Sequence, residues 1–110
     1  MRNEELVEKV RQVAKKANIS KLVGHIAYQF NIEGEGEGAF YLVIADGKVS
    51  VEPYEYYDRD VLIVVTQDVL LKLISGELKP LGAYADGEIT VYGDVEQLKM
   101  LPFGKEKKKK

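Results

Sequence analysis

The sequence predicts an α+β domain, with helices on one face of a largely antiparallel, five-stranded sheet. Three observations support this prediction. The apolar period is 3.6 residues at the start of the chain and changes to 2 at Gly24. Short turn signals such as Asp46-Gly47 separate successive period-2 stretches, so neighbouring strands run antiparallel. The second half of the chain alternates helical and extended patterns, which adds helices to the sheet.

Residues 4–17 have the pattern of an amphipathic helix, with apolar side chains every three or four positions: Leu6, Val10, Val13 and Ala17. Asn3 is a suitable N-cap residue, and Asn18 ends the periodic stretch. One helix with a single apolar stripe needs a surface to cover, and we expect the strands that follow to provide it.

Period-2 patterns predict strands over 24–32, 39–45, 48–52 and 61–66. The later elements are predicted as a helix over 67–75, a helical turn from Pro80, a strand over 88–92 and a helix over 95–101. Thr66 and Gly76 are suitable caps for the first of these, and Pro102 ends the last.

The stretch 31–39, NIEGEGEGA, places glycine at every second position and resembles a phosphate-binding loop at first sight. Such a loop leads from a strand into a helix, whereas these glycines lie between two predicted strands. Glu33, Glu35 and Glu37 would also repel a phosphate, and the stretch lacks the further oxygen ligands of a calcium loop. We interpret it as a wide hairpin.

The composition predicts one globular domain over residues 1–104, followed by a disordered lysine-rich tail at 105–110. The tail carries five lysines and one glutamate, a net charge of +4, so the remaining residues sum to −6. An acidic body argues against a nucleic-acid partner. Transient contact of the tail with an anionic membrane is the functional alternative to a merely solvated end. Without a signal-peptide pattern, a membrane-spanning run or a cysteine, the protein is expected to be cytoplasmic.

The residues for catalysis are sparse. His25 is the only histidine, it has no cysteine or second histidine as a metal-ligand partner, and its strand phase places it on the outer face. None of the serines lies in a nucleophile-elbow motif. We therefore expect no enzyme activity and no metal or other cofactor.

Residues 66–101, TQDVLLKLISGELKPLGAYADGEITVYGDVEQLKML, resemble the second half of the sterol carrier protein 2 domain, a lipid-transfer family. The matching positions are Ser75, Gly76, Leu78, Pro80, Ala83, Gly87, Ile89, Gly93 and Asp94. The resemblance implies strand order 3-2-1-4-5 and an apolar tunnel between the sheet and the helices. It also implies carriage of a fatty acid, acyl-CoA, sterol or phospholipid without chemistry and without a cofactor.

Carried onto this chain, the resemblance implies lipid-binding residues on the inner face of the sheet and on the helices: Phe30, Phe40, Leu42, Ile63, Leu70, Leu73, Ile74, Tyr84, Val91, Leu98, Met100, Leu101 and Phe103. Met100 and Phe103 are expected near the mouth. Met100 is the preferred single candidate, because an unbranched thioether adapts to ligands of varied shape. The same residues are also candidates for an ordinary core.

The opposite face of the predicted sheet is apolar at five positions: Tyr41, Val43, Leu62, Val64 and Tyr92. Such a patch is typical of a contact surface, and we expect two copies to pair through it as a homodimer. The alternative to a carrier is therefore an interaction module or an accessory subunit with a filled core. Three tyrosines, at positions 54, 56 and 57, lie in the connection between the strands predicted over 48–52 and 61–66. We interpret them as packing this connection against the edge of the sheet.

Overall fold

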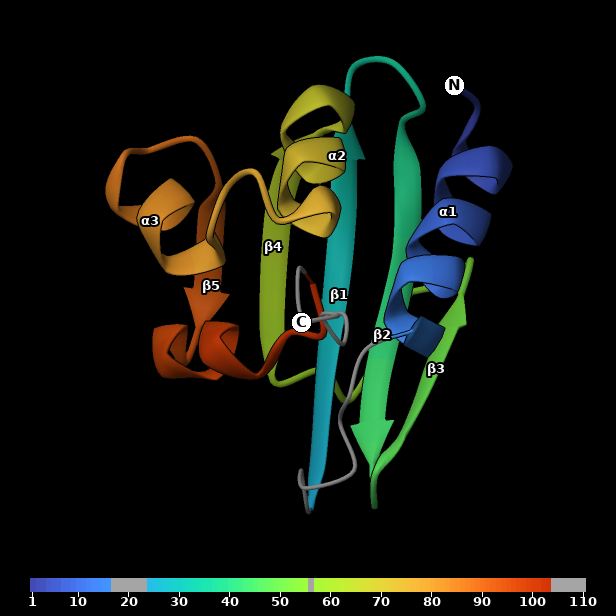
Figure 1. Cartoon of the computed structure of the whole chain (residues 1–110), viewed down its shortest axis with the longest axis vertical. Helices are drawn as coiled ribbons and strands as arrows, with labels where there is room; N and C mark the ends of the chain where they lie inside the picture. The colour runs from blue at the N-terminus through green and yellow to red at the C-terminus, as the bar shows by residue number, and fades with distance from the viewer. Residues whose placement is uncertain (17–23, 56, 104–110) are drawn as a thin grey trace, which may run out of the picture.

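The computed structural model describes residues 1–16, 24–55 and 57–103 (Figure 1). In chain order the elements are α1 (Asn3–Lys16), β1 (His25–Glu33), β2 (Gly38–Ala45), β3 (Lys48–Glu52), β4 (Val61–Thr66), α2 (Gln67–Ser75), α3 (Pro80–Ala85), β5 (Thr90–Gly93) and the 3-10 helix η1 (Val95–Met100). The predicted end of the first helix at Asn18 and the lysine-rich stretch 105–110 lie outside the described residues.

The five strands form one sheet in the order β3-β2-β1-β4-β5, which confirms the predicted α+β class and strand order. The β1–β2, β2–β3 and β4–β5 pairs are antiparallel, while β1 and β4 are parallel. Phe30 of β1 lies opposite Phe40 of β2 on one side and opposite Ile63 of β4 on the other. This register places the large apolar side chains of the central strands on a single face.

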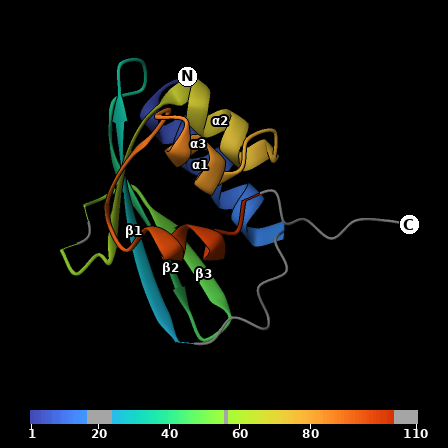
Figure 2. The ribbon, with the colours of Figure 1, turned by 90° about the vertical axis from the view of Figure 1, so that its left-hand side faces the viewer.

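The helices cover that face, and the sheet and helices form two layers (Figure 2). One cluster of buried side chains fills the space between the layers, with Tyr28, Phe30 and Phe40 as its largest fully buried members. Leu6 and Val10 join the cluster from α1, because its apolar positions recur at the helical period. In the part of the chain that the structure describes, no helix is both long and apolar enough to cross a bilayer.

The glycine-rich stretch is a hairpin turn, as predicted, and it holds the start of the chain. The Met1 amino group contacts Glu35 Oε2 at 2.7 Å, and Gln67 Nε2 donates to Met1 O at 2.8 Å. Asn3 Nδ2 donates to Gly36 O at 3.0 Å instead of acting as the expected N-cap within α1. Gly36 has φ +74°, and a Cβ there would lie 2.5 Å from Gln67 Nε2. This glycine is therefore required by close approach, not by phosphate binding.

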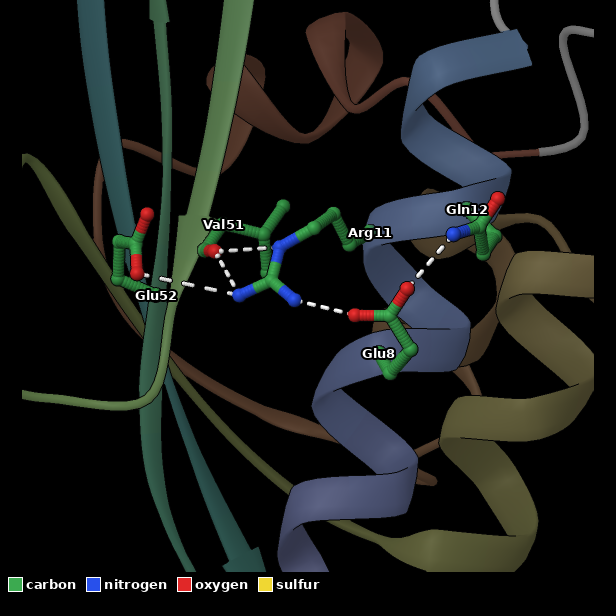
Figure 3. Close-up of polar contacts among 5 residues, drawn as sticks. All are labelled: Glu8, Arg11, Gln12, Val51 and Glu52. Carbon is green, nitrogen blue, oxygen red and sulfur yellow. Dashed lines mark hydrogen bonds and ion pairs between the residues drawn. The ribbon is translucent and has the colours of Figure 1, made fainter.

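Arg11 fixes α1 to the edge strand β3 (Figure 3). Its Nε and Nη2 atoms donate to the Val51 carbonyl at 3.1 and 2.7 Å, and its Nη1 pairs with Glu8. Hydrogen bonds from Gln12 and Arg11 hold the pKa of Glu8 below its usual value. Because an unpaired edge carbonyl invites pairing with another chain, Arg11 both positions the helix and covers part of the edge.

The later helices use the predicted caps. Thr66 Oγ1 accepts from Val69 N at 3.4 Å, and Gly76 ends α2 in the left-handed conformation at φ 86°. Asp94 caps the last element by accepting from Glu96 N, but this element is a 3-10 helix rather than the expected α-helix. Its shortness explains the difference, since six residues between a cap and Pro102 complete few α-helical hydrogen bonds.

Candidate functional site

An apolar cleft of about 240 Å³ lies where the start of α3, η1 and the segment after η1 meet. It is lined by Lys79, Pro80, Leu81, Leu98, Lys99, Leu101 and Phe103. Pro80 begins α3 at a position where its missing N–H costs no hydrogen bond. Leu101 and Phe103 follow η1 in an extended segment that packs into the core.

Phe103 forms the inner wall of this cleft. Its side chain is only 5% exposed, and its ring centroid lies 5.9 Å from that of Phe30. Phe30 in turn stacks on Phe40 with centroids 4.9 Å apart and an interplanar angle of 10°. The cleft is thus separated from the centre of the core by a side chain that comes from the last described residue.

A partly buried hydrogen bond ties η1 to the sheet. The Tyr28 hydroxyl donates to the Gln97 carbonyl at 2.8 Å. Burial raises the pKa of Tyr28 far above its usual value, and the nearby Asp60 carboxylate raises it further. Tyr28 is therefore neutral at physiological pH and keeps the proton that it donates, so it acts as a fixed anchor for the cleft wall.

The charged side chains in the described lining of the cleft are positive. Within residues 1–16, 24–55 and 57–103, the lining includes Lys79 and Lys99 and no carboxylate. Lys99 Nζ also pairs with Glu96 Oε1 at 2.9 Å across the exposed side of η1. An apolar groove with a cationic rim suits an amphipathic molecule that carries an anionic group at one end.

A larger recess of about 460 Å³ lies at the β1–β2 turn and has the opposite character. It is lined by Asn31, Ile32, Glu33, Gly34, Glu37, Gly38, Ala39 and Glu55. Three carboxylates disfavour an apolar or anionic ligand there. Among the described residues, no group of three or more histidines, cysteines or acids could hold a metal ion. The smaller apolar cleft is therefore the better candidate site despite its volume.

The structure buries ten of the thirteen predicted lipid-binding residues in the core: Phe30, Phe40, Leu42, Ile63, Leu70, Leu73, Ile74, Leu98, Leu101 and Phe103. Only Leu98, Leu101 and Phe103 of these line the cleft. Val91 and Met100 are half-buried, and Met100 is not in the cleft lining. The inward position expected for Tyr84 is wrong, because α3 turns its neighbour Ala83 to the core and leaves Tyr84 41% exposed.

Sequence reasoning missed four lining residues: Lys79, Pro80, Leu81 and Lys99. Pro80 was recognised only as a helix start. Leu81 follows it directly, and its apolar side chain within the predicted helical turn was the available signal; the structure leaves it half-buried. The two lysines are on elements that only the fold brings together, so no local pattern pointed to their proximity.

The five residues of the predicted contact surface do share the outer face of the sheet. Leu62 of β4 lies opposite Tyr92 of β5 on one side and opposite Gln29 of β1 on the other. Gln29 in turn lies opposite Tyr41 of β2, so the four residues form one row across the sheet. Tyr92 is 59% exposed, whereas Tyr41, Val43, Leu62 and Val64 are half-buried. Gln29 is only 3% exposed because the connection between β3 and β4 lies on this side, where Arg59 Nη1 donates to Gln29 Oε1 at 3.3 Å (Figure 2).

The packing expected for the tyrosines of that connection is wrong for the two that the structure describes. Tyr57 is 99% exposed, and Tyr54 is also exposed. The third tyrosine, at position 56, lies outside the described residues. Arg59 and the backbone approach the sheet instead, since Asp60 exchanges backbone and side-chain hydrogen bonds with Ala27.

Comparison with known proteins places this geometry in context. Among curated proteins, the chain is 33% identical over 69 residues to hydroxysteroid dehydrogenase-like protein 2 of Mus musculus and 32% identical over 69 residues to that of Danio rerio. These matches cover 62% of this chain, but only 14% and 17% of the relatives, which are much longer proteins.

Solved structures share the fold. The sec-alkylsulfatase Pisa1 from Pseudomonas sp. matches with a TM-score of 0.74 and 19% identity, over 89% of this chain and 16% of that one. The UbiJ-SCP2 ubiquinone synthesis protein matches with a TM-score of 0.67 and 18% identity, over 86% and 87%. Palmitated SCP2L2 from Aedes aegypti matches with a TM-score of 0.63 and 22% identity, over 93% and 92%. A family model described as the SCP-2 sterol transfer family matches residues 4–101, and the chain therefore belongs to that family.

Proposed function

We propose that this protein carries a lipid with a single acyl chain, held in the apolar cleft, and performs no chemistry on it. Membership of the SCP-2 sterol transfer family supports lipid binding or transfer in general. The observation that carries the specific proposal is the apolar cleft with Lys79 and Lys99 at its rim and Phe103 at its inner wall.

The dimensions of the cleft favour a flexible chain over a rigid ring system. Its volume of about 240 Å³ is below the ~300–1,000 Å³ of most ligand pockets. A flexible chain fills a narrow groove in segments and can extend inward where a side chain gives way. Palmitated SCP2L2, which shares the fold, is named for a fatty acyl ligand of this kind.

Displacement of Phe103 offers a route from the cleft into the core. The segment after η1 contributes Leu101 and Phe103 to the cleft, and η1 itself is held to the sheet by the Tyr28–Gln97 hydrogen bond. Each methylene that a ligand buries gains about 0.8 kcal/mol, so four or five methylenes offset the removal of one phenylalanine ring from the core. We propose that an acyl chain takes the place of this ring.

The absence of chemistry follows from the side chains at the cleft. Among the residues that the structure describes, its lining contains lysine amines but no histidine, hydroxyl or carboxylate group, and so no acid–base pair. The proposed roles of Lys79 and Lys99 are electrostatic, toward a carboxylate or phosphate of the ligand. Lys99 shares its charge with Glu96, so Lys79 is the stronger candidate.

Native mass spectrometry of freshly purified protein, followed by lipid extraction, tests the proposal. Co-purified lipid near one molecule per chain is expected. The variant Leu81→Trp, which fills the cleft, should lose this lipid, whereas Leu71→Trp should keep it. Leu71 is the matched control, since it is also a half-buried helical leucine but does not line the cleft. Folded protein that carries no lipid and shows no thermal shift with fatty acids would contradict the proposal.

A second candidate function is interaction through the outer face of the sheet. The exposure of Tyr57 and Tyr92 favours it, because tyrosine is enriched in protein interfaces. The mammalian and fish relatives contain the matched region as a small part of proteins named for a dehydrogenase. We propose that a second copy or an enzyme that uses an apolar substrate occupies this face.

A further inference from the structure

We infer that Phe30 is the specificity-determining residue of the cleft. Its ring ends the space that an acyl chain can enter, so the protein selects chains of about twelve carbons or fewer over longer ones. The inference rests on the proposed function, and it narrows the ligand class to medium-chain acyl groups. It follows from the different ways in which Phe103 and Phe30 are held, and from the volume in front of Phe30.

Phe103 is held weakly by its backbone. It comes two residues after Leu101, whose N–H donates to the Leu98 carbonyl at 3.3 Å. Pro102 has no N–H, and between the residues that the structure describes, no backbone hydrogen bond holds Pro102 or Phe103 to another element. Few backbone constraints therefore oppose a movement of the Phe103 ring out of the core.

Phe30 is held on both sides. It lies in β1, the central strand, opposite Phe40 of β2 on one side and Ile63 of β4 on the other. Its fully buried ring stacks on the equally buried ring of Phe40, with centroids 4.9 Å apart. Because core side chains are close-packed, the Phe30 ring moves away from the cleft only if Phe40 also moves.

The three rings follow one another inward from the cleft. The cleft lies at α3 and η1, on the β5 side of the sheet, and the segment after η1 runs from there toward β1 (Figure 1). The strand order leads from β5 through β4 and β1 to β2. Phe103 contacts Phe30 with centroids 5.9 Å apart, and Phe40 lies on the next strand. A chain that displaces Phe103 therefore meets Phe30 before Phe40.

The volume in front of Phe30 sets the length of the chain. A methylene is about as large as a water molecule, whose share of the liquid is about 30 Å³, so a cleft of about 240 Å³ holds about eight methylenes. The displaced ring of Phe103 makes room for about four more. Methylenes beyond this number stay in water and gain little affinity.

Lys79 defines the other end of the ligand. It lies in the lining of the cleft at the start of α3, and its exposed ammonium group is available to a carboxylate. A length limit requires that both ends of a chain are fixed, because a chain without a fixed head slides outward and loses no contact. Lys79 at the head and Phe30 at the tail fulfil this requirement.

Isothermal titration of wild type with saturated fatty acids of about eight to eighteen carbons, each below its micelle concentration, tests this inference. Each added methylene should improve affinity about four-fold, which corresponds to ~0.8 kcal/mol, up to about twelve carbons. Longer chains should gain almost nothing. A four-fold gain that continues to the longest chain would overturn the inference, and this result does not depend on the folding of any variant.

Phe30→Val tests whether Phe30 sets the limit. Valine suits a central strand and removes the volume of about two methylenes. A fatty acid of about fourteen carbons should then bind at least about five-fold tighter than one of about twelve, whereas wild type should bind the two with nearly equal affinity. A plateau that reflects only the poor solubility of long chains would not move with this substitution.

Phe40→Val is the matched control. It shortens the other ring of the stacked pair, at an equally buried position, but leaves Phe30 in place as the stop. Circular dichroism establishes that both variants are folded. The limit should stay near twelve carbons in Phe40→Val, as estimated above for wild type from the volume. An unchanged limit in Phe30→Val, or the same shift in both variants, would overturn the inference.

The same titrations separate this inference from the function on which it rests. If wild type binds fatty acids of every length with no plateau, the proposed function stands and only the length limit fails. If wild type binds no fatty acid of any length, the proposed function fails, and the length limit fails with it.

Discussion

The ring of Phe103 packs against Phe30 of the central strand, with centroids 5.9 Å apart, and closes the inner end of the apolar cleft. Phe103→Ala should lower the free energy of unfolding by about 3 kcal/mol, because it leaves a cavity in the core. The same variant should bind a medium-chain fatty acid more tightly than wild type, since the ligand no longer has to displace the ring. Denaturant unfolding and isothermal titration measure the two effects.

Phe40→Ala is the control for this variant. It removes the other ring that stacks on Phe30, but Phe40 does not line the cleft. It should destabilise the fold similarly without a gain in fatty-acid affinity. Weaker binding by Phe103→Ala than by wild type would show that Phe103 contacts the ligand instead of occupying its place.

Two glycines of the β1–β2 hairpin have similar backbone angles but different surroundings. Gly34 and Gly36 have φ values of +79° and +74°, but a Cβ at Gly34 has no neighbour within 4 Å, whereas one at Gly36 meets Gln67 and Met1. Gly34→Ala should cost about 1 kcal/mol of stability from backbone strain alone. Gly36→Ala should cost clearly more, measured by thermal unfolding. Equal losses would mean that the close packing of Gly36 against Gln67 and Met1 adds little stability.

Arg11 should stabilise the contact between α1 and β3. Arg11→Met keeps the aliphatic stem but removes the hydrogen bonds to the Val51 carbonyl, and should lower the free energy of unfolding by about 1–2 kcal/mol. Gln12→Ala, which removes only an exposed bond to Glu8, should change it by less than about 0.5 kcal/mol. Amide hydrogen exchange in β3 should also rise in Arg11→Met, and unchanged protection there would contradict the role in covering the edge.

Tyr28 should make the protein sensitive to alkaline pH. In the unfolded chain a tyrosine loses its proton near pH 10, whereas the raised pKa keeps Tyr28 protonated in the folded state. Its contribution is therefore fully present below about pH 10 and is lost as the pH rises above that value. Tyr28→Phe should cost about 1 kcal/mol at neutral pH, through loss of the bond to Gln97, and this difference from wild type should shrink above about pH 10.

Unfolding curves of both proteins from neutral to alkaline pH measure this difference. Tyr57→Phe serves as the control, because Tyr57 is almost fully exposed and the substitution removes no buried hydroxyl. A difference between wild type and Tyr28→Phe that stays constant across this range would contradict the buried, protonated state of Tyr28.

The outer face of the sheet should mediate any self-association. Tyr92→Glu places a charge on the most exposed of its five apolar residues and should leave the melting temperature nearly unchanged. Analytical ultracentrifugation should show a dimer for wild type at high concentration and a monomer for this variant. A wild-type monomer throughout would contradict the homodimer, and the face would then remain a candidate only for a different partner.

Most of the fold was predictable because its determinants are local. The alternating pattern of Tyr28 and Phe30 identified the central strand and its buried face, and Thr66 and Gly76 bounded α2 by hydrogen-bonding and backbone preferences of single residues. The 3-10 form of η1 was not predictable in this way, because the same six residues satisfy the pattern of a short α-helix. The hydrogen bond that anchors it, from Tyr28 to Gln97, also joins residues far apart in the chain.

The candidate site shows where local reasoning ends. The resemblance to a known family implied that Leu98, Leu101 and Phe103 line the binding site, but it did not distinguish core from ligand-binding surface. The sequence by itself determined the strand and helix segments, the inner face of the sheet and the absence of cysteine chemistry, because these follow from residue types at short spacings. Only the tertiary structure decided that Lys79 and Lys99 share one cleft, that Phe103 fills its inner end and that Tyr84 faces away, because such distances are set by how separate elements pack.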